Sequence, residues 1–398
     1  MLGGFHQLLM PGRILYGKGS FEQVGIEAAR LGTKVMIISD PVMEKVGNVS
    51  LCETYVHKQG MDFTTYTGID TEPTDLHLKE ALAICMEHQC DVIVAVGGGS
   101  CIDTAKAVAV MATNEGEIGD YRGTQRVFAA KPLPLIACPT TAGTGSEVTK
   151  VTVITDVQTQ VKMMISQPEL LPAVAIVDPL LTLSCPPAVT AATGVDALCH
   201  AVEAYWSRKS QPVTDTFALA AIERIMTYLP IAYESGENLK AREEVALGAM
   251  LAGAAFSNAS VTLVHGMSRP IGALFHVPHG ISNAMLLPVV LDYTRDSAEE
   301  KLASIGRMLH PEWRGMSAAE AADRIMDEIK GLCRKLGIPN MQEWGIDGDT
   351  FLRALPKMAA DALDSGSPAN HPRVPSHEEI MALYQKSYDY KWSYRQHA

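Results

Sequence analysis

Short apolar runs alternate with helix-like segments through the first 185 or so residues of the chain. Four of the runs are almost uninterrupted, which is typical of parallel strands buried on both faces of a sheet. These runs lie at residues 35–40, 91–96, 133–137 and 174–178. Two others, 151–155 and 161–165, flank the polar residues 156–160 and predict a β-hairpin. The first half is therefore predicted to be α/β, with a parallel sheet covered by helices on both faces.

The pattern changes after Pro186 and Pro187. Ala, Leu, Glu and Met then recur at helical spacing, with almost no β-branched runs. Helices are predicted at residues 189–207, 213–229, 241–258, 281–292, 317–336 and 377–386. The Gly, Ser and Pro content of residues 364–373 predicts a loop. We therefore expect an α/β domain at 1–185 and an all-α domain at 186–398.

Length and composition agree with a two-domain globular protein. The 398 residues are too many for one small core, and 47% hydrophobic with 20% charged residues is an ordinary composition. A net charge of −12 argues against a nucleic-acid partner, which would require clustered Lys and Arg. No apolar run approaches the roughly 20 residues of a membrane span, and the N-terminus lacks the pattern of a signal peptide. We expect no membrane partner and a cytoplasmic location.

The eight cysteines are scattered and form no Cys-x-x-Cys pair. Several lie in apolar runs, so most are predicted to be reduced core residues. Cys199 precedes His200 in a helical stretch, and we interpret it as a packing residue.

A glycine-rich turn, Gly97-Gly-Gly-Ser100, follows the second apolar run and precedes a helix-like segment at 101–110. Glycines let the main chain approach an anion closely, and Ser100 could cap the helix. The free amides and the positive end of the helix would then suit a pyrophosphate. The turn is not the common Gly-x-Gly-x-x-Gly fingerprint, and a tight turn without a ligand is the alternative.

A second polar loop, Pro139-Thr-Thr-Ala-Gly-Thr-Gly-Ser-Glu147, follows the third run. Its hydroxyls and amides could bind ribose, phosphate or the nicotinamide amide, although a solvated loop is the alternative. Two such loops at successive strand ends favour a shared ligand crevice. Asp40 ends the first run, where a carboxylate could bind the adenosine ribose and repel a 2′-phosphate, favouring NAD over NADP. A helix-capping role is the alternative for Asp40.

Four residues of the second half are candidate metal ligands. Asp196 and His200 are four residues apart, so a helix would present both side chains on one face. His265 and His279 could join them, because a buried carboxylate needs compensation that a divalent cation would supply. One carboxylate and three imidazoles suit Fe²⁺ or Zn²⁺ better than Mg²⁺ or Ca²⁺. His276 could replace His279 or line the pocket.

With these motifs the chain resembles the iron-containing (group III) alcohol dehydrogenase family over nearly its whole length. The motifs are Gly97-Gly-Gly-Ser-x-x-Asp103, Pro139 to Glu147, Asp196-x-x-x-His200, His265-Gly-Met and Pro278-His279-Gly280. The resemblance implies the dehydroquinate synthase-like architecture, in which residues 1–185 bind a dinucleotide and the helical residues 186–398 bind metal and substrate, with a cleft between them.

The resemblance also implies the site residues. Fe²⁺, or Zn²⁺ or another divalent ion in its place, would be held by Asp196, His200, His265 and His279. The candidate residues for binding NAD, or alternatively NADP, are Asp40, Gly97, Gly98, Gly99, Ser100, Asp103, Thr140, Thr141, Thr144, Thr149, Lys162 and Leu181.

One position departs from the family pattern. Many relatives read His-Gly-Met-x-His, and the last histidine is proposed to relay a proton near the substrate; here that position is Arg269. Arginine cannot shuttle a proton at neutral pH but can bind a carboxylate, sulfonate or phosphonate in a bidentate manner. The hypothesis is an alcohol or aldehyde substrate that carries an anion. Alternatively, Arg269 pairs with an acid, and His276 or water takes over the relay. His279, Arg269 and His276 are the catalytic candidates.

The expected activity is that of a metal-dependent NAD(P) alcohol dehydrogenase or aldehyde reductase. Hydride would pass between nicotinamide C4 and the carbon of a primary or secondary alcohol, with the metal as a Lewis acid. A glycerol-1-phosphate dehydrogenase or sugar-phosphate cyclase is an alternative that the scarcity of Lys and Arg near the motifs weakens. A non-catalytic nucleotide-binding protein is another, but it would not need the Asp/His set. The family resemblance also suggests a homodimer or larger assembly.

Overall fold

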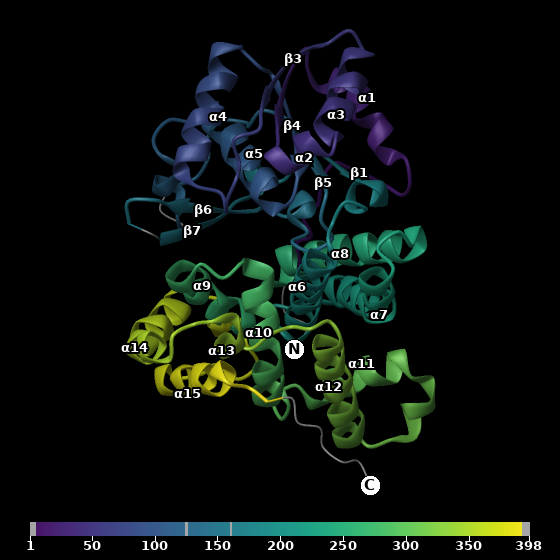
Figure 1. Ribbon diagram of the computed structural model, residues 1–398, viewed down its shortest axis with the longest axis vertical. Coiled ribbons are helices and arrows are strands. Elements are labelled where there is room, and N and C mark those ends of the chain that lie inside the picture. The colour runs from purple at the N-terminus through teal and green to yellow at the C-terminus, as the bar shows by residue number, and fades with distance from the viewer. Residues whose placement is uncertain (1–4, 124–125, 160, 392–398) are drawn as a thin grey trace. The chain divides into compact units, whose positions relative to one another are not determined.

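The computed structural model describes residues 5–123, 126–159 and 161–391 (Figure 1). The chain forms two compact units, residues 1–185 and 186–398. Residues 1–4, on which the signal-peptide prediction partly rests, and Gln160 of the predicted hairpin turn lie outside the described residues. Within the described ranges, no single helix is long and apolar enough to cross a membrane. Only the helices 239–259 and 263–275, taken together with a 102° bend, satisfy that test.

A parallel sheet forms the centre of the first unit. In its described residues the sheet has six strands in the order β1-β8-β5-β4-β2-β3. The strands are β1 (Arg13–Tyr16), β2 (Lys34–Ile38), β3 (Asp62–Tyr66), β4 (Val92–Gly97), β5 (Leu135–Pro139) and β8 (Val174–Val177). The four predicted runs form the four central strands. The sequence analysis missed the edge strands β1 and β3, because their partly exposed residues do not form an apolar run.

Alternate side chains of the central strands fill two different cores, as β2 shows. Val35 and Ile37 pack in one core with residues of α1 (Val24–Leu31) and α3 (Asn48–His57). Met36 and Ile38 pack in the other with α4 (Asp75–Glu87) and α5 (Gly99–Met111). Helices therefore cover both faces of the sheet, as predicted (Figure 1).

The predicted hairpin is present as the antiparallel strands β6 (Val151–Asp156) and β7 (Val161–Ser166). Hydrogen bonds tie it to α5: the Thr152 hydroxyl donates to the Asp103 carbonyl at 2.9 Å, and the Val153 amide donates to Asp103 Oδ2 at 2.9 Å. Asp103 thus fixes the hairpin to the helix that follows the glycine-rich turn.

The second unit is helical, and no strand occurs in its described residues, 186–391. Its helices are α6 (Pro187–Trp206), α7 (Pro212–Glu234), α8 (Leu239–Ala259), α9 (Leu263–Phe275), α10 (His279–Thr294), α11 (Glu299–Leu309), α12 (Ala318–Lys335), α13 (Met341–Trp344), α14 (Gly348–Asp364) and α15 (His377–Tyr388). All six predicted helices are among them. The predicted loop is also present, apart from Asp364, which ends α14, and a short 3₁₀ turn at Pro368–Asn370. The α/β and all-helical fold class is therefore confirmed.

Helix α9 was missed by the sequence analysis, although it carries His265. Gly266, Pro270 and Gly272 all disfavour a helix in isolation. The helix forms because one side of it is deeply buried: Leu263, Met267 and other apolar side chains are fully covered. Tertiary packing here overrides the local propensity.

Candidate metal centre

Helix α6 supplies two of the candidate ligands. Asp196 and His200 lie one turn apart and are both buried, with exposed fractions of 1% and 4%. Asp196 Oδ2 is 4.0 Å from His200 Nδ1. The spacing of these residues therefore places a carboxylate and an imidazole next to each other, as predicted.

Helices α9 and α10 bring the other two candidates to the same carboxylate. His265 is the third residue of α9, and its Nε2 lies 3.6 Å from Asp196 Oδ1. His279 is the first residue of α10, and its Nε2 lies 3.9 Å from the same oxygen. One ligand-capable atom from each of Asp196, His200, His265 and His279 lies within 4.8 Å of all the others. The structure thus brings two residues of α6 together with one residue each from α9 and α10, more than 50 residues further along the chain.

The protonation of these groups depends on their neighbours. Burial would raise the pKa of Asp196, but His200, His279 and His265 outweigh it and hold that pKa well below its ordinary range. Burial would lower the pKa of His265, but the Glu203 and Asp196 carboxylates outweigh it and raise the pKa to about 9. Asp196 is therefore an anion at neutral pH, surrounded by groups that favour its charge.

Asn283 tests whether a cation fits this cluster. Its Nδ2 lies 2.6 Å from Asp196 Oδ1 and 3.1 Å from Nε2 of both His265 and His279. Its Oδ1 is buried and has no hydrogen-bond partner. The Asn283 amide group thus lies among one carboxylate oxygen and two imidazole nitrogens, and one cation could bind the same three atoms once the imidazole nitrogens are deprotonated. The donor set, one carboxylate and three imidazoles, fits Fe²⁺ or Zn²⁺.

Glu203 and Asn283 belong to this centre, and the sequence analysis missed both. Glu203 follows His200 by three residues, so it continues the same face of α6, and its Oε2 accepts a hydrogen bond from His265 Nδ1 at 2.5 Å. Asn283 follows His279 by four residues on α10. Helical spacing from a known ligand was the signal that could have identified each of them.

The other two catalytic candidates differ in burial. Arg269 lies one turn beyond His265 on α9, is partly buried, and donates from Nη1 to the Ser365 carbonyl at 3.4 Å. Burial lowers the pKa of Arg269 to about 10, so the guanidinium remains charged at neutral pH. His276 is exposed and ends α9 in a left-handed conformation, with φ of 54°. His276 is not one of the four clustered residues; His279 is.

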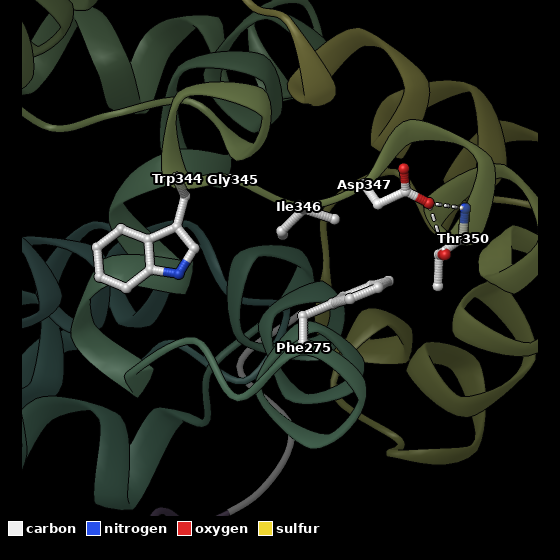
Figure 2. Close-up of a pocket in the computed structure, with 6 residues that line it drawn as sticks. All are labelled: Phe275, Trp344, Gly345, Ile346, Asp347 and Thr350. Atoms are coloured by element: carbon white, nitrogen blue, oxygen red, sulfur yellow. Dashed lines mark hydrogen bonds between the residues drawn. The ribbon is translucent and has the colours of Figure 1, made fainter.

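A pocket of about 240 Å³ lies at the end of α9 (Figure 2). Its lining residues are Phe275, Trp344, Gly345, Ile346, Asp347 and Thr350. Asp347 is the N-cap of α14, and its Oδ1 accepts hydrogen bonds from the amide and the hydroxyl of Thr350. None of these six residues belongs to the Asp/His cluster, so the pocket is separate from the candidate metal centre.

In the first unit, the two predicted nucleotide loops are in contact. Gly97 at the end of β4 pairs with Pro139 at the end of β5. A Cβ added to Gly99 would lie 2.8 Å from Thr144 Cγ2, whereas a Cβ added to Gly98 would meet nothing closer than 3.5 Å. The loops therefore share one edge of the sheet, and there is space above Gly98. The prediction that Ser100 caps α5 is wrong: α5 begins at Gly99, and Gly98 is its N-cap.

Asp40 lies where the order of the strands reverses, between β2 and β4. Its Oδ1 accepts hydrogen bonds at 2.9 Å from the amides of Val42 and Met43, so Asp40 caps α2 (Pro41–Lys45). Its Oδ2 accepts a hydrogen bond from Cys101 Sγ at 3.4 Å. The capping alternative for Asp40 is thus observed, and ribose binding through this carboxylate stays a prediction.

Several other predicted cofactor residues hold the loops in place. Asp103 Oδ1 accepts from the Ser146 hydroxyl at 2.6 Å, and Thr149 Oγ1 accepts from Lys106 Nζ at 2.9 Å. Lys162 forms an ion pair with Glu72. Thr140 and Leu181 are buried, and Thr141 lies beside Gly98. These contacts give the residues structural roles, and their contacts with a dinucleotide stay predictions.

The cysteines have the structural character predicted for them. None of the eight forms a disulfide, and all except Cys185 are buried. Cys199 Sγ is close to the Asn283 carbonyl, at 3.9 Å, inside the second unit.

Comparison with known families identifies both halves of the chain. Residues 11–179 match a family described as iron-containing alcohol dehydrogenase. Residues 190–388 match one described as the C-terminal part of the Fe-containing alcohol dehydrogenase family. The chain is also 37% identical over 384 residues to 1,3-propanediol dehydrogenase from Klebsiella pneumoniae, covering 96% of this chain and 98% of that protein.

Two solved structures extend the comparison to three dimensions. A crystal structure of 1,3-propanediol oxidoreductase has a TM-score of 0.92 at 37% identity, covering 96% of this chain and 100% of that one. A sulfoacetaldehyde reductase from Bifidobacterium kashiwanohense in complex with NAD⁺ has a TM-score of 0.86 at 28% identity, covering 98% of this chain and 100% of that one. The similarity therefore extends over nearly the whole chain in sequence and in fold.

Proposed function

Because this chain belongs to the iron-containing alcohol dehydrogenase family, we propose that it is an NAD-dependent alcohol dehydrogenase or aldehyde reductase with its reaction centre at Asp196, His200, His265 and His279. The convergence of these four side chains within 4.8 Å is the observation that carries the proposal. A nucleotide-binding protein without catalysis would have no use for a buried carboxylate surrounded by three imidazoles.

The residues of the centre would bind one divalent cation, Fe²⁺ or alternatively Zn²⁺. When bound, such an ion supplies a Lewis acid that stabilises negative charge on a substrate oxygen. The Asp196 carboxylate offsets part of the positive charge, and the imidazoles contribute neutral nitrogen donors. The Asp196, His200 and His265 side chains are 2–5% exposed, whereas that of His279 is 37% exposed. A substrate would therefore approach from the side of His279.

For the cofactor we propose NAD, with NADP as the alternative. Two features of the first unit support a dinucleotide: the amides of Gly98 and Gly99 at the start of α5, and the adjoining threonine-rich loop after β5. Asp40 at the strand reversal supports NAD over NADP, because its carboxylate would repel a 2′-phosphate. The reaction would transfer hydride between nicotinamide C4 and the substrate carbon.

We further propose that the substrate carries an anionic group. Arg269 supports this, because it lies one helical turn beyond His265 and keeps its charge while partly buried. A guanidinium in that position can bind a carboxylate or sulfonate but cannot relay a proton. The similarity to a sulfoacetaldehyde reductase, whose named substrate bears a sulfonate, agrees with this substrate class.

Arg269→Ala tests the substrate class. Losing one charge-assisted hydrogen-bonding partner costs about 1.5–3 kcal/mol, so kcat/KM for an ω-hydroxy acid should fall roughly 10- to 150-fold. The value for an uncharged alcohol of the same length should change far less. Equal losses on both substrates would contradict the anion hypothesis.

A substrate panel tests the proposed function as a whole. Purified protein, treated with a chelator and then supplied with Fe²⁺ or Zn²⁺, is assayed for NADH and NADPH formation from primary, secondary and ω-carboxylated alcohols. We expect cation-dependent formation of NADH. A panel that shows no turnover with any cation would count against an enzyme. We also propose a homodimer or larger assembly, which light scattering after size exclusion would test.

A further inference from the structure

Glu203 is a fully buried carboxylate near the end of α6, and it is not one of the four candidate cation ligands. Its Oε1 accepts hydrogen bonds from the Thr262 hydroxyl at 2.7 Å and from the Val264 amide at 2.6 Å. Its Oε2 accepts from His265 Nδ1 at 2.5 Å. One carboxylate thus holds the start of α9 and the ring of the ligand candidate in that first turn.

These contacts determine where the proton of His265 lies. The Val264 amide is a backbone donor and cannot reverse its role, so Oε1 must accept there. The Thr262 hydroxyl accepts a hydrogen bond from Trp206 Nε1 at 2.9 Å and donates its one hydrogen to Glu203 Oε1. His371 Nδ1 lies 3.2 Å from the same hydroxyl oxygen. A carboxylate can only accept, so His265 Nδ1 must carry a hydrogen. In the neutral ring, Nε2 then keeps its lone pair.

That lone pair is on the nitrogen that faces the cluster. His265 Nε2 lies 3.6 Å from Asp196 Oδ1 and 3.1 Å from Asn283 Nδ2. We propose that Glu203 is a positioning residue for the cation centre: it holds the proton of His265 on Nδ1 and so reserves Nε2 for the cation. This inference rests on the proposed function and adds a residue to its machinery. Carboxylates that orient ligating imidazoles in this way typically influence metal affinity by 10- to 100-fold.

Glu203→Gln separates this role from a structural one. The Gln carbonyl oxygen must face the Val264 amide, because the opposite orientation would place two N–H groups against each other at 2.6 Å. The Gln NH₂ group then faces His265 Nδ1 and can only donate to it. His265 must accept at Nδ1 and carry its proton on Nε2, which is the form that cannot bind a cation. The hydrogen bonds to Thr262 and Val264 remain, and no unpaired carboxylate is left at position 203.

The first experiment measures Zn²⁺ affinity, by competition with a chelating dye, and the melting temperature of the chelator-treated protein. For Glu203→Gln we expect affinity to fall roughly 10- to 100-fold. The melting temperature of the chelator-treated variant, measured at pH 9.5 where His265 is neutral and forms no ion pair with Glu203, should be unchanged or higher. The matched control, Thr262→Val, removes one hydrogen bond to Glu203 but leaves the contact with His265. It should have the opposite result, a lower melting temperature with affinity close to wild type. Wild-type affinity in Glu203→Gln, or the larger affinity loss in Thr262→Val, would overturn the inference.

A second measurement distinguishes the proton position from a simple effect of charge. Long-range ¹H–¹⁵N correlations in Zn²⁺-loaded protein labelled at histidine report which ring nitrogen of His265 bears the hydrogen. In the wild type we expect the hydrogen of His265 on Nδ1. In Glu203→Gln we expect a signal from His265 that has no Zn²⁺ bound and carries its hydrogen on Nε2. A wild-type signal with the hydrogen on Nε2 would overturn the inference even if the variant does not fold. A wild-type protein that binds no cation at all would instead overturn the proposed function, and this inference with it.

Discussion

The pH dependence of the cation-free protein should reveal the buried charge of His265. Two carboxylates raise the pKa of this group from 6.5 to about 9 in the folded protein. A group whose folded pKa lies above its unfolded pKa stabilises the fold fully below the unfolded value, here pH 6.5. That stabilisation is lost as pH rises through the folded value.

The size of the effect follows from the shift in pKa. A shift from 6.5 to about 9 corresponds to about 3 kcal/mol at 1.36 kcal/mol per pKa unit. The residue is buried, so solvent does not screen the interaction. For a unit of this size, 1 kcal/mol changes the melting temperature by roughly 2–4 °C. The second unit should therefore melt about 6–12 °C lower at pH 9.5 than at pH 6.5 because of this one group.

The assay compares wild type with His265→Asn, both treated with a chelator, by differential scanning calorimetry at several pH values. Asn places an amide donor near the position of Nδ1 and so keeps a partner for Glu203, but it does not titrate. The difference between the two proteins cancels the titration of groups that do not interact with His265. The stabilisation by added Zn²⁺ should instead increase with pH, because the cation must displace the proton of His265. The apparent affinity for Zn²⁺ should rise about tenfold per pH unit below pH 9. Identical pH profiles in the two proteins would mean that His265 carries no buried charge in the cation-free protein.

Three further substitutions test other parts of the account. Asn283→Ala removes a hydrogen bond to buried Asp196, so the free energy of unfolding of the cation-free protein should fall by about 1.5–3 kcal/mol. Saturating Zn²⁺ should narrow the difference in melting temperature between wild type and variant, and a difference that Zn²⁺ does not change would contradict this. Gly98→Ala should leave folding intact, since its Cβ would meet no atom closer than 3.5 Å, but it should weaken NADH binding in a fluorescence titration. Unchanged binding would argue against the pyrophosphate site. Asp40→Asn keeps a capping oxygen for α2 yet removes the charge, so the ratio of kcat/KM for NADP to that for NAD should rise; a constant ratio would argue against ribose recognition by Asp40.

The sequence predicted the elements whose pattern is local. The central strands were found because their residues are buried on both faces and leave an apolar run, as residues 35–38 of β2 do. The edge strand β3 has two exposed residues at its start, and its sequence does not differ clearly from that of a loop. Helix α9 was missed because its glycines and Pro270 disfavour a helix, and only contacts with distant segments stabilise it.

The candidate site shows the same limit. The spacing of Asp196 and His200 was sufficient to predict that they share a helix face. The approach of His265 and His279 to that face depends on how α9 and α10 pack, and the sequence analysis reached it through resemblance to a family. Glu203 follows His200 by one helical turn, but its contact with His265 depends on how α9 packs against α6, which the local sequence does not encode. The failed prediction that Ser100 caps α5 has a simple cause: the helix begins two residues earlier than predicted, at Gly99 rather than at residue 101.

We propose that Asp196, His200, His265 and His279 together hold the one cation on which alcohol oxidation depends. Its most direct test is a reconstitution of chelator-treated protein with increasing Fe²⁺ or Zn²⁺, with bound metal and NADH formation measured on the same samples. We expect activity to rise in proportion to bound metal, to reach its maximum at one ion per chain, and to be lost together with that ion in His200→Ala. Full activity in the metal-free protein, or an ion bound equally well by His200→Ala, would contradict it.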